Sequence, residues 1–196
     1  MESIVSIRKH LPDSFVVLID NSNVSRELGS LVDLMVSDVT NETLRRATDE
    51  AEAKQLGEAM LLLQGLEALK QQQVMFKHLF KLTGRYVLND DFNYSTYRNS
   101  MNVFKLAKLG RSVSLHKDFY AYTCFFKIDW EHVESFRAAL SRIVGDLSHM
   151  LESNIPTMLH DDVESRLSLM LPNVKYVQVL GVTQRVSTWE TEDKDI

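Results

Sequence analysis

The chain has 196 residues, of which 44% are hydrophobic and 25% charged, a composition typical of a globular protein with a substantial core. Its net charge of -5 argues against a general nucleic-acid-binding surface, which would be basic. The single cysteine, Cys124, excludes an intramolecular disulfide and a cysteine-rich zinc site. No apolar run approaches the roughly 18 residues of a membrane-spanning helix, and the first residues lack the pattern of a signal peptide, so we expect a cytoplasmic protein.

The N-terminal part predicts a helix followed by a buried strand. Residues 3–10 read as a helix with cations at its C-terminal end, and Pro12 lies in the break that follows. Residues 15–19 form a continuous apolar run of five, which is typical of a strand buried on both faces of a parallel sheet. Asp20 and Asn21 follow it, at the end of the strand where ligands bind in open α/β sheets. The same pair also fits a turn or a helix cap.

Two further helices are expected before the middle of the chain. Residues 24–36 carry apolar side chains at helical spacing, and residues 38–52 read as a polar surface excursion or a loosely attached helix. Residues 54–72 have the clearest helical pattern, with one apolar stripe that we interpret as core. The stripe consists of Leu56, Ala59, Met60, Leu63, Leu66 and Leu69.

Residues 81–91 concentrate charged and turn-forming residues around a short strand predicted at 86–88. Two cations of different geometry suit phosphate binding. A glycine permits a backbone angle or a close ligand approach that other residues resist, and adjacent aspartates offer oxygen ligands to a hard metal ion. The residues concerned are Lys81, Gly84, Arg85, Asn89, Asp90 and Asp91. An ordinary strand with a charged turn at each end fits the pattern equally well.

The chain after this stretch predicts a mixed β region. Residues 92–97 read as a short helix or loop, and strands are expected at 101–109, 112–116 and 120–128. The six histidines show no spacing typical of a zinc helix. Phosphate-loop, dinucleotide-binding and nucleophile-elbow motifs are also missing from the sequence, which argues against most nucleotide hydrolases, dehydrogenases and esterases.

The C-terminal part predicts two helices and two strands. Asp129 caps a long amphipathic helix over residues 130–152, and a second helix is expected from Pro156 to about residue 169. The last strands are expected over 174–180 and 182–187, on either side of Gly181, and residues 188–196 form an acidic tail that we expect to be frayed. Strands that alternate with amphipathic helices favour a mainly parallel sheet covered by helices.

Four segments together resemble glycosyltransferases of the GT-A type, known mainly from bacterial and viral surface-glycan loci. They are residues 15–22, the helix that Gly57 and Glu58 open, residues 80–86, and the stretch from 162–164 to 180–182. The resemblance covers most of the chain. It implies one α/β domain over residues 1–187 with a mainly parallel central sheet flanked by helices, followed by the tail. It also implies transfer of a sugar from a nucleotide-sugar donor to a glycan acceptor.

The resemblance suggests roles for individual residues. Asp20 would contact the nucleoside, with Asn21 beside it, and Lys81 and Arg85 would contact the diphosphate, with Gly84 and Asn89 completing the substrate site. Glu164 is the acid/base candidate, because an inverting transferase needs a carboxylate to take the acceptor proton. A surface glutamate in the first turn of a helix fits the Glu164 pattern equally well.

The chain departs from the GT-A pattern in two ways. It begins inside what would be the first helix, so the family's first strand is missing and the chain looks truncated. The position of the family's acidic motif is occupied by residues 81–85, and the acidic pair Asp90 and Asp91 comes later. Either this pair holds Mn²⁺ or Mg²⁺ with the nucleotide-sugar, or Lys81 and Arg85 neutralise the diphosphate without a metal. We favour the cations. A non-catalytic or degraded GT-A-like binding protein is the alternative.

Overall fold

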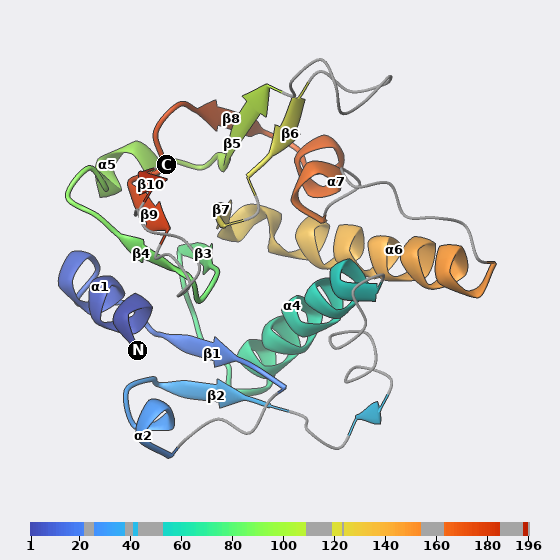
Figure 1. Cartoon of the computed structure of the whole chain (residues 1–196), viewed down its shortest axis with the longest axis horizontal. Coiled ribbons are helices and arrows are strands. Elements are labelled where there is room, and N and C mark those ends of the chain that lie inside the picture. Colours follow the sequence, from blue (N-terminus) through green and yellow to red (C-terminus); the bar gives the residue numbers. More distant parts are fainter. Residues whose placement is uncertain are drawn as a thin grey trace. The chain divides into compact units, whose positions relative to one another are not determined.

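The computed structural model describes residues 1–21, 26–37, 41–42, 53–108, 119–122, 124–153, 163–184 and 194–195. The chain divides into two compact units. Their helices and strands are labelled in Figure 1. The first unit comprises Met1–Ser14, Phe76–His132 and Pro172–Ile196, and the second comprises Phe15–Met75 and Val133–Leu171. Each unit is therefore assembled from segments that are far apart in the sequence.

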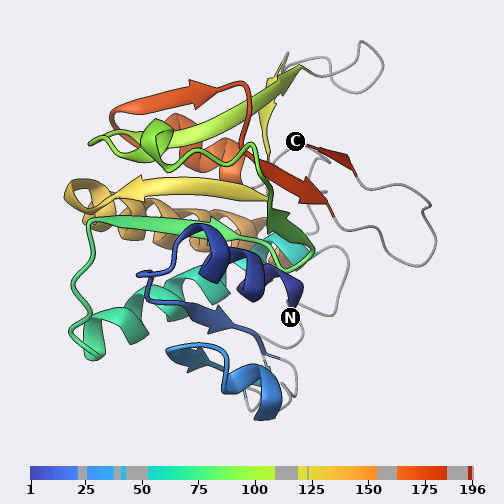
Figure 2. The ribbon, with the colours of Figure 1, turned by 90° about the vertical axis from the view of Figure 1, so that its left-hand side faces the viewer.

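The described residues of the first unit form two sheets and two helices. Its helices are α1 (Glu2–His10) and α5 (Tyr94–Tyr97), with a 3-10 turn η2 (Trp130–His132). Its strands are β3 (His78–Leu82), β4 (Tyr86–Leu88), β5 (Asn102–Lys108), β6 (Phe119–Ala121), β7 (Phe125–Asp129), β8 (Val174–Val177), β9 (Val182–Gln184) and β10 (Lys194–Asp195). The larger sheet has the order β3–β7–β5–β6, with β8 also paired to β5, and the smaller one has the order β10–β9–β4 (Figure 2).

The larger sheet is mixed, so the prediction of a mainly parallel sheet is wrong. Strand β3 pairs antiparallel with β7, β7 with β5, and β5 with β6, whereas β5 and β8 run parallel. A parallel pair needs a long crossover connection, usually through a helix. Among the described strands, parallel pairing is found where helices lie between the two strands in sequence, as for β5 and β8. The coarser expectation of an α/β protein is confirmed.

An aromatic core fills the space between the sheets of the first unit. Phe80 lies on β3 and Phe125 on β7, with ring centroids 5.7 Å apart. Phe92 stacks on Tyr97 at 5.5 Å. The buried members of this core are Leu88, Phe92, Tyr97, Val103, Cys124, Phe125, Leu180 and Val182. Cys124 is thus a buried thiol, as its apolar sequence context suggests.

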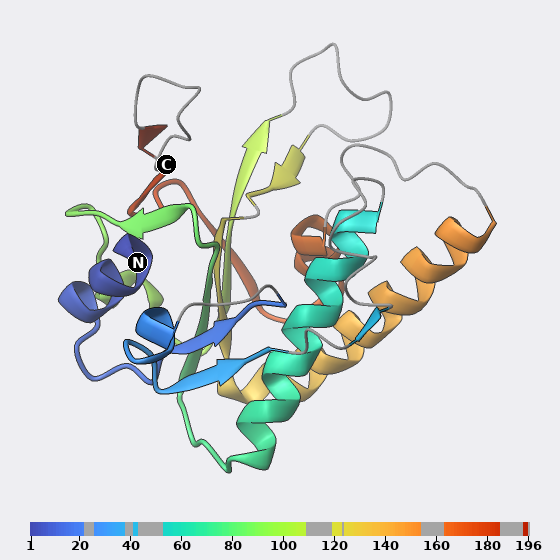
Figure 3. The same cartoon turned by 60° about the horizontal axis from the view of Figure 1, so that its bottom comes forward.

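The second unit combines helices with a small parallel sheet. Its elements are β1 (Val17–Ile19), α2 (Arg26–Gly29), β2 (Leu34–Val36), α4 (Lys54–Gln71), α6 (Val133–Glu152) and α7 (Val163–Met170). Helices α4 and α6 pack side by side (Figure 3). The expected helices at 54–72 and 130–152 are confirmed, except that the first turn of the latter is η2.

Two expectations in the second unit need correction. Residues 15–19 do contain a strand, but β1 pairs only with β2 among the described strands and is half-buried, and Phe15 is 48% exposed. The expected helix over 24–36 is wrong, because α2 ends at Gly29 and Leu34–Val36 is strand β2, parallel to β1. The Asp33 carboxylate accepts a hydrogen bond from the Val16 N–H at 2.6 Å, and this contact aligns the two strands. Backbone pairing with β1 outweighed the helical spacing.

Some expectations for the rest of the chain change as well. The strand expected over 120–128 is two separate strands, β6 and β7. The tail is not frayed at Lys194–Asp195, which pairs with β9 as β10. The strand expected at 112–116 lies outside the described residues, as do most of the 38–52 stretch and the first residues of the helix expected from Pro156.

Candidate functional site

The turn between β3 and β4 carries the predicted cations and is fixed by backbone hydrogen bonds. The N–H of Thr83 donates to the carbonyl of Cys124 at 2.9 Å, and the N–H of Tyr86 donates to the carbonyl of Thr83 at 2.9 Å. The hydroxyl of Ser3 donates to the carbonyl of Gly84 at 2.9 Å. The backbone around Gly84 and Arg85 is therefore held by a neighbouring strand, by its own turn and by α1.

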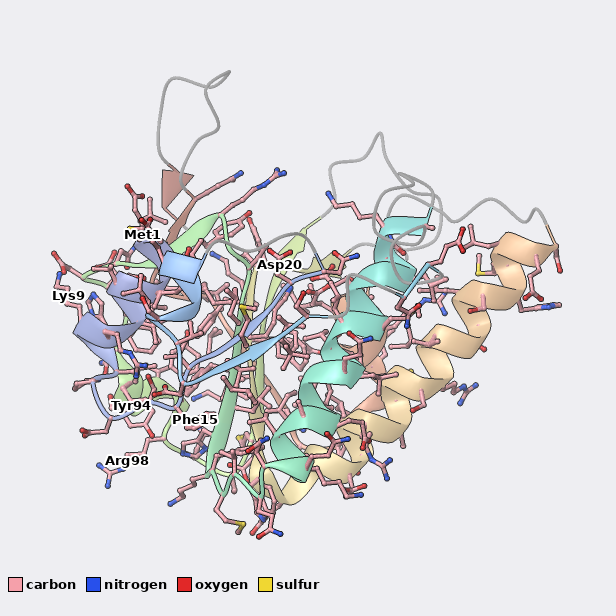
Figure 4. All side chains as sticks on the ribbon, turned by 90° about the horizontal axis from the view of Figure 1, so that it is seen from below. Met1, Lys9, Phe15, Asp20, Tyr94 and Arg98 are labelled. Atoms are coloured by element: carbon pink, nitrogen blue, oxygen red, sulfur yellow. The ribbon has the colours of Figure 1, made fainter. Side chains whose placement is uncertain are left out.

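Helix α1 covers the edge of β4 that does not pair with β9. Ser3, Ser6 and Lys9 recur at every third position and so lie along one side of the helix. The Ser6 hydroxyl accepts a hydrogen bond from the Leu88 N–H at 3.0 Å, and the Lys9 ammonium lies 2.9 Å from an Asp90 carboxylate oxygen (Figure 4). Sequence reasoning missed this stripe, although the recurrence of polar residues at every third position was a signal. The stripe thus provides a hydrogen-bond acceptor for a backbone N–H at the edge of β4 that would otherwise be unpaired.

Arg85 is exposed at the tip of this turn and is available to an anion. Within the described part of the chain, its guanidinium has no hydrogen-bond or ion-pair partner. Asp90, on the other side of β4, is paired with Lys9. Lys81 lies on β3, with its ammonium 5.7 Å from the centre of the Phe126 ring. The two predicted cations thus flank one rigid turn.

Gly84 is not required by the backbone conformation. Its φ lies outside the left-handed region, which among the described glycines is occupied by Gly181. The prediction that position 84 needs glycine for an unusual backbone angle is therefore wrong. A Cβ placed there would meet no described atom within 4 Å, so the space beside Arg85 is open.

Asn89 serves the turn that follows β4. Its amide nitrogen donates to the Thr183 hydroxyl at 3.0 Å, and its amide oxygen accepts from the Asp91 N–H at 3.0 Å. Its backbone N–H donates to the carbonyl of Gly181 at 3.0 Å. Gly181 has φ of +73°, and an added Cβ would lie 2.3 Å from the Cα of Phe92. The Asn89 side chain is thus engaged in holding β4 to β9.

Asp90 and Asp91 do not by themselves fit a protein-built metal site. The hydrogen bond and the charge of Lys9 lower the pKa of Asp90 below its usual value. In the described ranges, no group of three histidine, cysteine, aspartate or glutamate side chains could share an ion. Mg²⁺ can use one carboxylate together with substrate phosphates, and Asp91 is the member of the pair that Lys9 does not neutralise.

We expect titration calorimetry of the free protein with Mn²⁺ to show no tight stoichiometric binding. The reason is that Lys9 already neutralises Asp90, which leaves one carboxylate for the ion. The comparison variant is Asp91→Asn, which should match the unmodified protein in this experiment. Tight binding that disappears in Asp91→Asn would contradict the expectation and indicate a metal-dependent protein.

The remaining predicted site residues belong to the second unit. Asp20 and Asn21 follow β1, and the Asp20 N–H donates to the carbonyl of Val36 at 3.0 Å, which continues the β1–β2 pairing by one residue. Glu164 lies in the first turn of α7 and is 0% exposed, so the alternative of a surface glutamate is wrong. Its predicted role as an acid/base stays a prediction. The structure groups these three in one unit and the other six predicted residues in the other.

A buried charged cluster was missed by sequence reasoning. His78 on β3 pairs in register with Asp129 on β7, and Lys127 lies two residues before Asp129 on the same face. The Lys127 ammonium donates to an Asp129 carboxylate oxygen at 2.9 Å and to the carbonyls of Asn99 and Met101 at 2.6 and 2.7 Å. A lysine and an aspartate two apart in an apolar run were a signal, because such a spacing puts both on one side of a strand.

The comparisons with known proteins do not assign the chain to a family. No protein-family model matches it, and no curated protein is significantly similar to it. Among the described helices, none has the length and apolar character needed to cross a membrane.

Proposed function

We propose that the chain binds the diphosphate of a nucleotide-sugar at the β3–β4 turn and is a GT-A-like glycosyltransferase. The observation that carries this proposal is the exposed Arg85 guanidinium, which has no partner within the described residues and sits on a turn fixed by three hydrogen bonds. Buried or paired arginines are common in folds, whereas a rigidly presented unpaired one is suited to a ligand anion.

The chemistry of the turn suits a diphosphate. The planar guanidinium of Arg85 can donate two parallel hydrogen bonds to phosphate oxygens, and Lys81 adds a compact charge. The open space beside Gly84 leaves room for a bulky anion. Because the backbone is already fixed, binding loses less conformational entropy than it would at a mobile loop.

These cations would also favour the transfer step. In sugar transfer the bond between the anomeric carbon and the diphosphate oxygen breaks, and its electron pair leaves with the diphosphate. The acceptor hydroxyl oxygen forms the new bond to the anomeric carbon, and its proton passes to a base. Positive charge beside the leaving diphosphate stabilises the developing negative charge. Glu164 is the predicted base, but its burial gives this role no support.

A non-catalytic nucleotide-sugar-binding protein is the second candidate. This candidate is favoured because two of the residues predicted for chemistry have other surroundings: Glu164 is buried, and Asp90 is paired with Lys9. Incubation with a panel of nucleotide-sugars separates the two candidates. An enzyme releases nucleoside diphosphate in the presence of acceptor, whereas a binding protein shows saturable binding without release.

We expect Arg85→Ala to weaken binding of a nucleoside diphosphate by roughly 1.5–3 kcal/mol, the scale of a hydrogen bond to a charged group. Calorimetry with the best ligand from a panel of nucleoside diphosphates measures this change. The matched control is Arg98→Ala, which removes another exposed arginine of the same unit, pointing away from the ribbon (Figure 4). Circular dichroism should show that both variants stay folded. Equal affinity for the two variants would overturn the assignment of the turn.

A further inference from the structure

His78, Lys127 and Asp129 form a charged cluster in the first unit. In this cluster only one of the two ring nitrogens of His78 has a hydrogen-bond partner among the described residues. The Nδ1 of His78 lies 3.2 Å from an Asp129 carboxylate oxygen, and the His78 side chain is 2% exposed. Its Nε2 is buried and has no hydrogen-bond partner within the described part of the chain. Nδ1 therefore carries the proton of the neutral ring, and Nε2 is an acceptor that faces no donor.

A second positive charge is poorly tolerated at this place. Burial, together with the neighbouring Lys127 charge, lowers the pKa of His78 below its ordinary value, although Asp129 acts in the opposite direction. Asp129 already neutralises Lys127, whose ammonium is 0% exposed. Protonated His78 would share one carboxylate with Lys127 and would place a new N–H donor where no acceptor lies.

The segment from Tyr94 to Met101 both covers this cluster and is attached to it. The Tyr94 ring lies edge-on to His78 with centroids 6.2 Å apart, and Tyr94 is 39% exposed. At the other end, the carbonyls of Asn99 and Met101 accept hydrogen bonds from Lys127. Between them Tyr97 is buried and its hydroxyl donates to the carbonyl of Leu180 at 2.8 Å. Tyr94 is thus the part of the cover that can move while Tyr97 stays anchored.

We propose that protonation of His78 displaces Tyr94 and opens this side of the first unit to water, so that the protein carries an acid-sensitive gate. Opening lets water accept the hydrogen bond from the new Nε2–H. The groups that act on His78 from the packed elements are Lys127 and Asp129 on β7, Tyr94 on α5, and Phe80 and Lys77 on or beside β3. Among the charged groups, Asp129 favours the protonated ring, whereas Lys127 and Lys77 oppose it. The gate is independent of any nucleotide at the β3–β4 turn.

The direction of the pH effect follows from linkage. In the closed form burial and Lys127 hold the pKa of His78 below its ordinary value of about 6.5, and exposure to water in the open form brings the pKa back towards that value. Opening therefore takes up a proton as the pH falls below that value. The open population rises by up to about tenfold for each pH unit until the lowered pKa of the closed form is reached, and is constant below it.

Hydrogen–deuterium exchange between pH 7.5 and 5 tests the gate. After correction for the intrinsic exchange rate, amides of residues 94–96 should exchange faster in acid, while those of β7 and β3 and of the anchored Tyr97 should not. His78→Phe, which keeps a ring but cannot titrate, should abolish the acceleration. His132→Gln removes another histidine of the same unit and should keep it. Acceleration that persists in His78→Phe, or no acceleration in the unmodified protein, would overturn the proposal.

A second measurement covers the case in which His78→Phe does not fold. Imidazole nitrogen resonances of the unmodified protein report the charge and tautomer of His78 directly. We expect a neutral ring protonated on Nδ1 at pH 6.5 and a shift of Tyr94 signals that follows its titration. A His78 that is already protonated at that pH in the closed form, or that titrates without any change at Tyr94, would contradict the gate.

Discussion

Replacing Lys127 with methionine is expected to lower the free energy of unfolding by about 3–5 kcal/mol, the effect of breaking a buried ion pair by removing one partner. Methionine keeps the length of the side chain but removes its charge. The Asp129 carboxylate then loses its nearest counter-charge, and the carbonyls of Asn99 and Met101 lose their donor. Burial by itself raises the pKa of Asp129, and the hydrogen bond from Lys127 is the largest of the effects that lower it.

Urea unfolding followed by far-UV circular dichroism measures this loss. Lys175→Met is the control, because Lys175 is an exposed lysine of β8 in the same sheet, and this change should alter stability by less than about 0.5 kcal/mol. The double variant Lys127→Met, Asp129→Asn should recover part of the loss, since a neutral amide needs no counter-charge. A change below about 1 kcal/mol in the single variant would show that Lys127 is not essential to the cluster.

Tyr97→Ala is also expected to lower the free energy of unfolding by about 3–5 kcal/mol, the range for removing a large aromatic side chain from a core. Tyr97 is 1% exposed and packs against Phe92 and Phe125 with ring centroids 5.5 Å away in each case. Burial raises the pKa of its hydroxyl above the usual range, so the hydroxyl remains a donor to Leu180. Tyr97→Phe removes only that hydrogen bond and should lower stability by about 1–3 kcal/mol.

Comparing Tyr97→Ala with Arg85→Ala separates an effect on stability from an effect on the proposed nucleotide binding. In Tyr97→Ala, nucleotide binding should be lost together with the near-UV circular dichroism signal of the aromatic core. In Arg85→Ala, binding should weaken while that signal stays. The unfolding midpoint should be lowest for Tyr97→Ala, higher for Tyr97→Phe and highest for the unmodified protein. Equal midpoints for the two Tyr97 variants would show that the ring adds little to stability.

The sequence was sufficient to predict the long helices but not the sheet. Helices α4 and α6 have apolar residues at helical spacing over many turns, and such repetition outweighs local exceptions. Strand pairing depends on contacts between distant segments, such as Leu88 with Val182, which local pattern does not encode. For the same reason Leu34–Val36, with helical spacing around it, became a strand beside β1.

The sequence could indicate which residues lie in the β3–β4 turn, but not how their side chains pair. Arg85 is exposed there, whereas Asp90 pairs with Lys9, more than 80 positions away. For Glu164 the sequence left an acid/base role and a surface position open, because the first turn of a helix is usually solvated, and the side chain is buried. The His78–Asp129 contact joins strands 51 positions apart, so neither residue alone indicated it.

The order in which the chain is synthesised matters for the small sheet. Asn89 and its partner Thr183 are 94 positions apart. At roughly 5–20 residues per second, β4 emerges from the ribosome about 5–20 s before β9 exists to pair with it. Ser3 and Ser6 are made earlier still, so α1 can occupy one edge of the nascent strand from the outset. The other edge stays open until β9 arrives, so the interval between the synthesis of β4 and that of β9 is a period in which the unpaired edge can aggregate or be bound by chaperones.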